Sequence, residues 1–243
     1  MSVPEWFTGQ YYTEFLSEIC RQRNVLSYLE IGVMHGDSLA GIVCSTAIGV
    51  DPCFLLTKDV TKGKAALHLY QTTSDRFFAE IDARLVIGGD LEMAFLDGLH
   101  AFEVLLRDFS NTEAICSPAS LIAIHDCMPL APEMIDRNLA AGVPDGPYKG
   151  YWTGDVWKIV PILRKYRPDL TVALVDCPPT GLVLVTGLDP TSRILQVQYD
   201  AIVREFEPVP NDAASMQRLY QENAVVSSQL AKQNHGGGVG RQA

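Results

Sequence analysis

Short apolar runs alternate along the chain with longer segments in which apolar residues recur every three or four positions. The apolar runs predict seven strands, at residues 27–33, 47–50, 66–71, 93–96, 120–124, 171–175 and 181–186. Alternation of strands with helices is typical of βαβ units, whose strands lie parallel in one sheet. Only residues 177–180 join the last two strands, too few for a helical crossover, so we predict that these two strands pair antiparallel.

Helices are predicted in the segments between these strands and after the last one. In the segment 155–166, Val156, Ile159 and Leu163 share one apolar face, and Asp155 is placed to cap the first turn. The same periodicity predicts further helices at 12–21, 38–44, 74–81, 101–115, 191–206 and 213–233. The predicted fold class is therefore α/β.

The segment 128–153 departs from this alternation. It is rich in proline and glycine and carries Tyr148, Tyr151 and Trp152 near its end. A long irregular stretch inside a compact domain is more often a lid or a substrate loop than a linker. The predicted organisation is one domain over residues 1–210 with a lid at about 128–153, a C-terminal helix at 211–234 and a disordered tail at 235–243.

Composition narrows the class of protein. The chain of 243 residues is 47% hydrophobic, enough for a buried core, while its longest apolar runs are far shorter than the roughly 20 residues of a membrane-spanning helix. With 19 Lys+Arg against 29 Asp+Glu, the net charge of -10 argues against a nucleic-acid partner bound through its phosphates. The N-terminal segment lacks the basic and apolar stretches of a secretory signal, so a cytoplasmic location is expected.

The first candidate site is the turn that follows the first predicted strand. Gly32 and Gly36 permit a tight turn and a close approach of the backbone to a ligand, and the carboxylate of Glu30 can accept hydrogen bonds from an ammonium or hydroxyl group. A dinucleotide turn has the spacing Gly-x-Gly-x-x-Gly, but Met34 stands where its second glycine belongs. We therefore expect a ligand without a pyrophosphate, with an empty structural turn as the alternative.

Acidic and hydroxyl residues follow the next two strands. Asp51 ends the second strand, where a carboxylate lies over the ligand crevice of a parallel sheet and can accept from both hydroxyls of a ribose. Together with the glycine turn, Asp51 indicates an adenosine ligand. Ser74 and Asp75 follow the third strand and either contact the adenine or cap the helix that begins there.

Two later strands each end in an aspartate with a neighbouring histidine. Asp97 precedes His100 by three residues after the fourth strand, and His125 directly precedes Asp126 after the fifth. Neighbouring strands of a sheet lie about 5 Å apart, so Asp97 and Asp126 can converge on one hard divalent cation, Mg²⁺ or Mn²⁺. The alternative is that each aspartate only caps the helix that follows.

Over residues 27–188 these motifs resemble the class I S-adenosylmethionine-dependent methyltransferases. The sequence Asp97-Gly98-Leu99-His100 followed by His125-Asp126 is similar to the metal-dependent O-methyltransferases that act on macrolide sugars. The resemblance implies a Rossmann-like, seven-stranded, mostly parallel sheet with helices on both faces and an antiparallel last strand. It implies that S-adenosylmethionine is bound by the glycine turn and the acidic residues before and after it, Glu30, Gly32, Gly36 and Asp51.

The same resemblance implies that Asp97 and Asp126 bind the metal and that His100 is the general base. Two positions depart from the relatives. His125 stands where they have an acidic residue, and Cys127 stands where catechol-type enzymes have asparagine. Either a third metal ligand comes from elsewhere, with Asp155 as a candidate, or the metal is bound more weakly.

The function implied is transfer of a methyl group to a hydroxyl, first of all on a sugar or a glycosylated metabolite, with a small molecule or an oligosaccharide as acceptor. His125, Tyr148, Tyr151, Trp152 and Asp155 are expected to lie at the acceptor or in the lid. A catechol-like or polyketide acceptor and a non-catalytic cofactor-binding protein are the alternatives. Neither a nucleic acid nor a membrane is expected as a partner, and the helices at 12–21 and 213–233 could form a homodimer interface.

Overall fold

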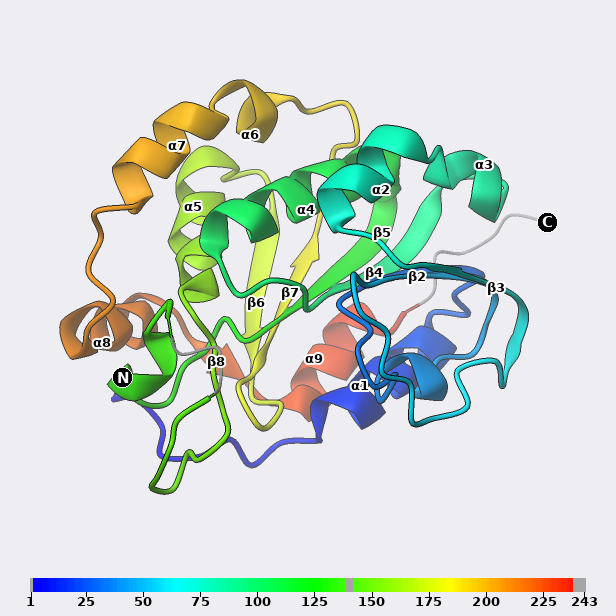
Figure 1. Cartoon of the computed structure of the whole chain (residues 1–243). Helices are drawn as coiled ribbons and strands as arrows, with labels where there is room; N and C mark the ends of the chain where they lie inside the picture. The colour runs from blue at the N-terminus through cyan, green and yellow to red at the C-terminus, as the bar shows by residue number, and fades with distance from the viewer. Residues whose placement is uncertain (1, 139–141, 238–243) are drawn as a thin grey trace.

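The computed structural model describes residues 2–138 and 142–237. Within these ranges, eight strands form one sheet in the order β3-β2-β1-β4-β5-β7-β6-β8. Helices cover both faces of the sheet (Figure 1). The predicted α/β fold is confirmed, with eight strands rather than the seven that the sequence predicts.

The strands at the centre of the sheet run parallel. The last of the seven predicted strands, at 181–186, runs antiparallel as predicted. β1 (Ser27–Ile31) pairs parallel with β2 (Cys44–Val50) and β4 (Leu91–Leu96), while β3 (Lys64–Tyr70) and β5 (Cys116–His125) extend this parallel part on either side. β7 (Leu182–Thr186) lies between β5 and β6 (Thr171–Val175) and is antiparallel to both.

The two faces of the sheet carry separate apolar clusters. On one face α1 (Tyr12–Gln22) packs beside α9 (Ser228–His235), and on the other α4 (Phe102–Ile115) packs beside α5 (Ile159–Tyr166) (Figure 1). The remaining helices are α2 (Ser74–Glu80), α3 (Ala83–Ile87), α6 (Ile194–Val197), α7 (Tyr199–Phe206) and α8 (Ala213–Glu222). In the described part of the chain, none of the helices has the length and apolar character needed to cross a bilayer.

The predicted C-terminal helix at 213–233 is wrong as a single element. It is two helices, α8 and α9, separated by the short strand β8 (Val225–Val226), which pairs parallel with β6. Two consecutive β-branched valines favour the extended conformation, and the side chain of Ser227 then caps α9 by accepting from the backbone of Leu230. The helix predicted at 191–206 is likewise divided, into α6 and α7.

Two further differences concern short segments. The helix predicted at 38–44 is only the 3-10 turn η1 (Leu39–Gly41), because β2 begins at Cys44 and the β-branched residues before it are extended. The helix α3 was not predicted. Residues 139–141 of the predicted lid and 238–243 of the predicted tail lie outside the described residues.

Candidate active site

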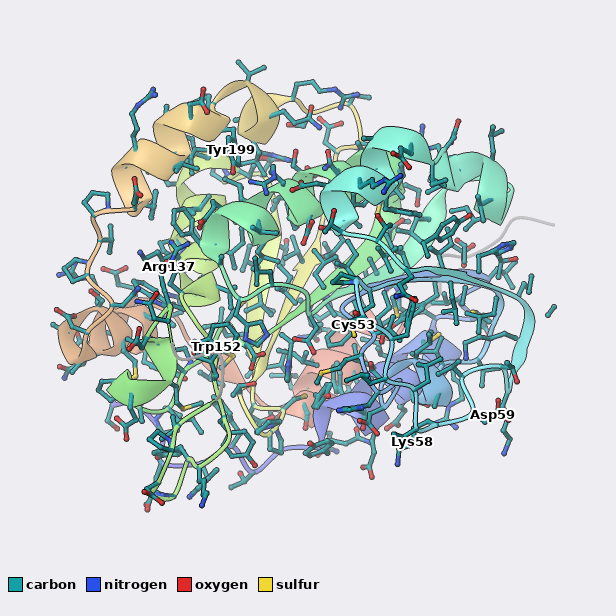
Figure 2. The ribbon with its side chains drawn as sticks, viewed as in Figure 1. Cys53, Lys58, Asp59, Arg137, Trp152 and Tyr199 are labelled. Carbon is teal, nitrogen blue, oxygen red and sulfur yellow. The ribbon has the colours of Figure 1, made fainter. Side chains whose placement is uncertain are left out.

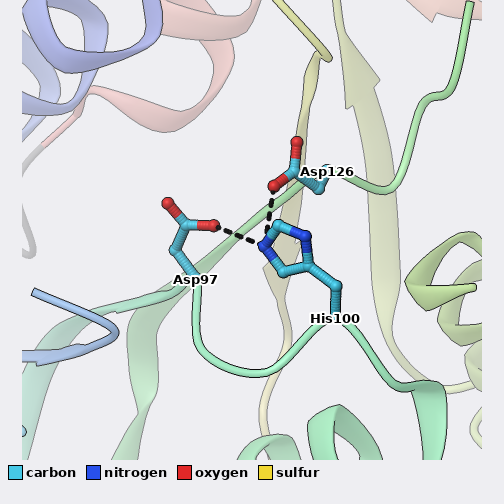
Figure 3. Close-up of side chains that lie close together, drawn as sticks. All are labelled: Asp97, His100 and Asp126. Atoms are coloured by element: carbon cyan, nitrogen blue, oxygen red, sulfur yellow. Dashed lines mark ion pairs between the residues drawn. The ribbon is translucent and has the colours of Figure 1, made fainter. Parts of the chain in front are cut away.

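Three side chains converge where β4 and β5 end. Asp97 directly follows β4, Asp126 directly follows β5, and His100 lies in the turn between β4 and α4 (Figure 3). Nε2 of His100 lies 3.0 Å from Oδ2 of Asp126 and 3.6 Å from Oδ1 of Asp97. One ligand atom from each residue lies within 4.8 Å of the other two, a spacing that suits a single metal ion. The structure thus brings the two predicted carboxylates together and adds an imidazole to them.

The end of the predicted lid orients the ring of His100. Its Nδ1 lies 2.9 Å from the carbonyl oxygen of Trp152, and because a carbonyl only accepts, Nδ1 must carry a proton and donate it. The ring of Trp152, which is labelled in Figure 2, also packs on the imidazole, at 4.8 Å between centroids and with the planes tilted by 35°. Gly154 lies so close that a Cβ there would be 2.0 Å from the carbonyl oxygen of His100. These contacts leave Nε2 directed at the two carboxylates.

His125 lies under the same carboxylates. Its Nδ1 is 3.3 Å from Oδ1 of Asp97 and 3.4 Å from Oδ2 of Asp126, and its ring packs at 4.2 Å between centroids on Tyr12. A place for His125 at the acceptor or in the lid stays a prediction, and its side chain is only 7% exposed. The reason is that β5 extends to residue 125, one residue beyond the predicted strand.

Thr180 completes the cluster and was missed in the sequence. It lies in the turn between β6 and β7, where its hydroxyl donates to Oδ1 of Asp126 at 2.6 Å and lies 3.3 Å from Nε2 of His125. The sequence feature that could have pointed to Thr180 is a polar residue in a proline-rich turn between two buried strands. Thr180 therefore links the carboxylate of Asp126 to the ring of His125.

Burial and neighbouring charges act in opposite directions on the pKa values of this cluster. Burial lowers the pKa of His125, but the charges of Asp126 and Asp97 outweigh it and raise that pKa to about 10. The pKa of His100 is raised in the same way, against its burial, mainly by Asp126. Burial alone would raise the pKa of Asp126, yet His125 and His100 hold it well below its usual range. The carboxylates thus favour a positive charge among these side chains.

The glycine turn after β1 lies against the end of β4. Gly32 has φ +90, and a Cβ there would lie 1.9 Å from the backbone oxygen of Asp97, so only glycine fits at this position. Gly36 also has a positive φ, +81, and a Cβ there would meet Val60 at 2.6 Å. The turn is as tight as the sequence predicts, and it places the first candidate site next to the aspartate that follows β4.

Both acidic residues of the predicted cofactor site already accept hydrogen bonds within the protein. Glu30 is fully buried and accepts from the hydroxyls of Tyr28 at 2.8 Å and Ser38 at 2.6 Å, and its burial raises the pKa of its carboxyl to about 8. Asp51 accepts from the backbone N–H groups of Met34 at 2.8 Å and Cys53 at 2.7 Å. Glu30 therefore supports the turn from within, whereas Asp51 retains further lone pairs for another donor.

Comparison with known proteins tests the fold. No protein-family model matches the sequence, and no curated protein matches it. A solved structure of the O-methyltransferase from Bacillus cereus in complex with SAH matches with a TM-score of 0.54 at 10% identity, covering 75% of this chain and 83% of that one. The O-methyltransferase TomG from Streptomyces achromogenes, involved in tomaymycin synthesis and solved in complex with SAM, matches with a TM-score of 0.51 at 16% identity, over 72% of this chain and 78% of that one.

The chain has the class I methyltransferase fold. The resemblance predicted from the sequence is confirmed at the level of the fold. In this methyltransferase fold, the cluster of Asp97, His100 and Asp126 and the turn of Gly32 lie side by side, since a Cβ on Gly32 would touch the backbone of Asp97.

The residues after β3 connect the methyltransferase sheet to α4. Thr73, rather than Ser74 or Asp75, caps α2 with its side chain. Arg107 donates from Nε and Nη2 to the two carboxylate oxygens of Asp75, both at 2.7 Å. Ser74 is buried. Contact of Ser74 or Asp75 with an adenine stays a prediction.

Asp155 stabilises the methyltransferase fold from a position outside the cluster. It is fully buried, and its Oδ1 accepts from the backbone N–H of Phe102 at 3.0 Å, which caps α4 rather than the helix that Asp155 precedes in sequence. Its Oδ2 lies 3.0 Å from Nη1 of Arg137 and 3.2 Å from Nζ of Lys158. With both oxygens engaged, Asp155 does not supply the third ligand that the sequence left open.

The three aromatic residues of the predicted lid have different surroundings. Tyr148 donates from its hydroxyl to the backbone oxygen of Glu5 at 2.9 Å and packs on the ring of Trp6 at 4.9 Å between centroids. Tyr151 also lies against Trp6, at 6.4 Å. Trp152 instead contacts His100. Of these three rings, Trp152 is therefore the one placed at the carboxylate cluster.

Proposed function

We propose that this protein is an S-adenosylmethionine-dependent O-methyltransferase that methylates a hydroxyl of a sugar or glycosylated metabolite, with a divalent cation at Asp97 and Asp126 and with His100 as the general base. One observation carries the proposal: the cluster of Asp97, His100 and Asp126 lies against the Gly32 turn. The two solved neighbours, which carry SAH and SAM, support the choice of cofactor.

The donor atoms of the cluster fit a divalent cation. Two carboxylate oxygens face each other across the imidazole of His100, and such oxygens repel unless a positive charge lies between them. A bound cation supplies a positive charge beside the acceptor hydroxyl, which lowers the pKa of that hydroxyl. Asp97 and Asp126 would hold this cation.

With a cation at Asp97 and Asp126 to offset the carboxylate charge that raises the pKa of His100, Nε2 of His100 would be free to receive a proton. Donation from Nδ1 to the carbonyl of Trp152 stabilises the protonated ring, as a fixed partner does for a general base. The acceptor oxygen forms a bond to the methyl carbon, the bond from that carbon to sulfur breaks with its electron pair left on sulfur, and the proton of the acceptor passes to His100. A positioned base of this kind contributes about 10²–10⁴-fold to the rate.

The ring of Trp152 supports a cyclic acceptor. It stacks on the imidazole of His100, so a sugar or aromatic ring that reaches the base would also meet the indole. A sugar is placed first, and a catechol-like or polyketide hydroxyl is the competing acceptor.

The experiment begins with titration calorimetry of the full chain with S-adenosylhomocysteine. It continues with transfer of a radiolabelled methyl group to a panel of glycosylated macrolides, free sugars and catechols, with and without EDTA. We expect binding and EDTA-sensitive transfer to a sugar hydroxyl. No binding of S-adenosylhomocysteine would refute the proposal, and transfer only to catechols would replace the acceptor class.

A further inference from the structure

We infer that Nδ1 of His125 is the third protein ligand of the cation, so that the site has mixed nitrogen and oxygen donors and prefers an imidazole-binding ion such as Fe²⁺, Co²⁺ or Zn²⁺ over Mg²⁺. The inference deepens the proposed function and rests on it for the purpose of the cation. Binding of the ion itself is measured separately. It is carried by the position and the surroundings of one buried ring.

The hydrogen bonds around Thr180 determine which nitrogen of His125 carries the proton. An ionised carboxylate only accepts, so the Thr180 hydroxyl uses its single hydrogen to donate to Oδ1 of Asp126, at 2.6 Å. The contact of 3.3 Å between Thr180 and Nε2 of His125 must then be donated by the ring. A histidine that binds an ion is neutral, and with its proton on Nε2 the electron pair on Nδ1 is the one that would face the ion.

Nδ1 of His125 faces the two carboxylates. Nδ1 of His125 is buried and makes no hydrogen bond in the described part of the chain. It lies 3.3 Å from Oδ1 of Asp97 and 3.4 Å from Oδ2 of Asp126, the same two oxygens that face His100. The two carboxylates favour a positive charge at this position, which either a proton on Nδ1 or a bound cation supplies, and a cation would displace that proton.

The spacing of the donors suits a single ion. Bonds of about 2.0–2.2 Å from a metal to nitrogen or oxygen place neighbouring ligand atoms about 3.0–3.5 Å apart. The contacts among His125, Asp97 and Asp126 fall in this range, at 3.3 and 3.4 Å. These three donors can therefore share one ion with little movement.

The ring of His125 is also supported in the manner of a metal ligand. Ligating histidines almost always donate their other N–H to a neighbouring group, which fixes the ring and its tautomer, and Thr180 is that group here. Tyr12 and Phe95 pack against the ring at 4.2 and 5.9 Å between centroids. The site is thus formed before any ion binds.

The nitrogen donor changes which ion is preferred. Mg²⁺ takes oxygen ligands almost exclusively, whereas imidazole suits Fe²⁺, Ni²⁺, Cu²⁺ and Zn²⁺. The two carboxylates alone would favour Mg²⁺ or Mn²⁺, as the sequence suggests. With His125 as a ligand, we expect Co²⁺ to bind at least about 100-fold more tightly than Mg²⁺.

The test uses the metal-free full chain, titrated with Co²⁺ and with Mg²⁺ in a calorimeter and followed by proton NMR. A histidine bound to Co²⁺ gives a strongly shifted, exchangeable signal from its other ring N–H. We expect such a signal from His125 in the wild type, its loss in His125→Gln, and its retention in His68→Gln, which alters an exposed histidine on β3. His125→Glu should lower the preference for Co²⁺ over Mg²⁺ at least about tenfold.

Thr180→Val provides a second test that keeps the ligand. It removes the partner of Nε2 and should weaken Co²⁺ binding about 10–100-fold while the shifted signal of His125 persists. Equal affinities for Co²⁺ and Mg²⁺ in the wild type, or a pattern of shifted signals unchanged in His125→Gln, would overturn the inference. Should His125→Gln fail to fold, Thr180→Val decides: unchanged Co²⁺ affinity overturns the inference.

These measurements distinguish failure of the proposed function from failure of His125 as a ligand. Tight Co²⁺ binding through His125, without binding of S-adenosylhomocysteine, refutes the proposed function and leaves this site in place. Binding of S-adenosylhomocysteine and methyl transfer that resists EDTA, together with no Co²⁺ binding, refutes the site and leaves methyl transfer in place.

Discussion

The carboxylates near the carboxyl ends of the parallel strands form two pairs, which differ in the groups that their oxygens contact. At the ends of β1 and β2, Glu30 and Asp51 accept hydrogen bonds from hydroxyls and backbone N–H groups of the protein. At the ends of β4 and β5, Asp97 and Asp126 both face two imidazoles, and one oxygen of Asp126 also accepts from the hydroxyl of Thr180. The first arrangement is stable by itself, while the second is stabilised by an added positive charge. All four were candidate ligand-binding residues in the sequence, and their contacts separate a turn supported by the protein from the cluster that we propose as a cation site.

The largest effect is expected at His100. His100→Ala should lower kcat by about 10²–10⁴-fold, because the proton of the acceptor loses its base. Affinity for S-adenosylhomocysteine should not change, since His100 belongs to the cluster after β4 and β5 and not to the predicted cofactor residues at the ends of β1 and β2. Steady-state kinetics and calorimetry measure the two quantities, with His68→Ala as the control. A wild-type rate would remove the base, and a large loss of Co²⁺ affinity would make His100 a ligand instead.

Asp155, like Glu30, is a carboxylate whose oxygens are engaged by groups of the protein, so its removal should lower the free energy of unfolding. Asp155→Ala leaves the N-terminus of α4 without its cap and the buried ammonium of Lys158 without its partner. The free energy of unfolding measured in urea should therefore fall by about 3–5 kcal/mol. Asp75→Ala removes a more exposed ion pair with Arg107 and should lower the free energy of unfolding by at most about 1 kcal/mol. Similar losses in the two variants would contradict the distinction.

Glu30 should reveal its burial through pH. Its pKa in the folded protein is about 8, above the ordinary 4.5, so the folded state holds the proton more tightly than the unfolded state. Wild-type stability relative to Glu30→Gln should therefore fall as pH rises from 4.5 towards 8, by up to about 1.4 kcal/mol per pH unit.

The control for this pH dependence has the opposite sign. Arg107 holds the pKa of Asp75 below its ordinary value, so stability relative to Asp75→Asn should be lost as pH falls. Urea unfolding at a series of pH values measures both variants. A stability difference for Glu30→Gln that does not vary between pH 5 and 8 would show that Glu30 is solvated.

The smallest effect is expected at Tyr148. Tyr148→Phe removes one hydrogen bond to the backbone of Glu5 and keeps the ring on Trp6, so thermal unfolding should show a loss of about 0.5–1.5 kcal/mol. Methyl transfer should not change, because this ring lies away from the cluster. A lowered kcat with unchanged stability would instead place Tyr148 at the acceptor.

Local patterns predicted most of the parallel sheet and the aspartates that end its strands. An apolar run of four residues, at 47–50 or 93–96, followed by Asp51 or Asp97 is visible in the sequence, because the residue that ends a buried strand is its immediate neighbour. The continuous helix at 213–233 was wrong because helical periodicity there competes with pairing between β8 and β6, and this pairing joins residues about fifty positions apart.

The partners of the site residues depended on the packing of distant segments. His125 became part of the cluster because β5 continues through it, Thr180 reaches it from a turn more than fifty residues later, and Asp155 caps a helix that begins at Phe102. No periodicity in the sequence encodes such contacts.

The order of strands and turns, and the residue types at each strand end, follow from the sequence because they depend on neighbours along the chain. Which carboxylates are satisfied by the protein, and which remain directed at His100 and His125, follows from the three-dimensional packing alone. The physical reason is that a hydrogen bond or a repulsion between charges depends on distance in space, and separation along the chain does not determine that distance.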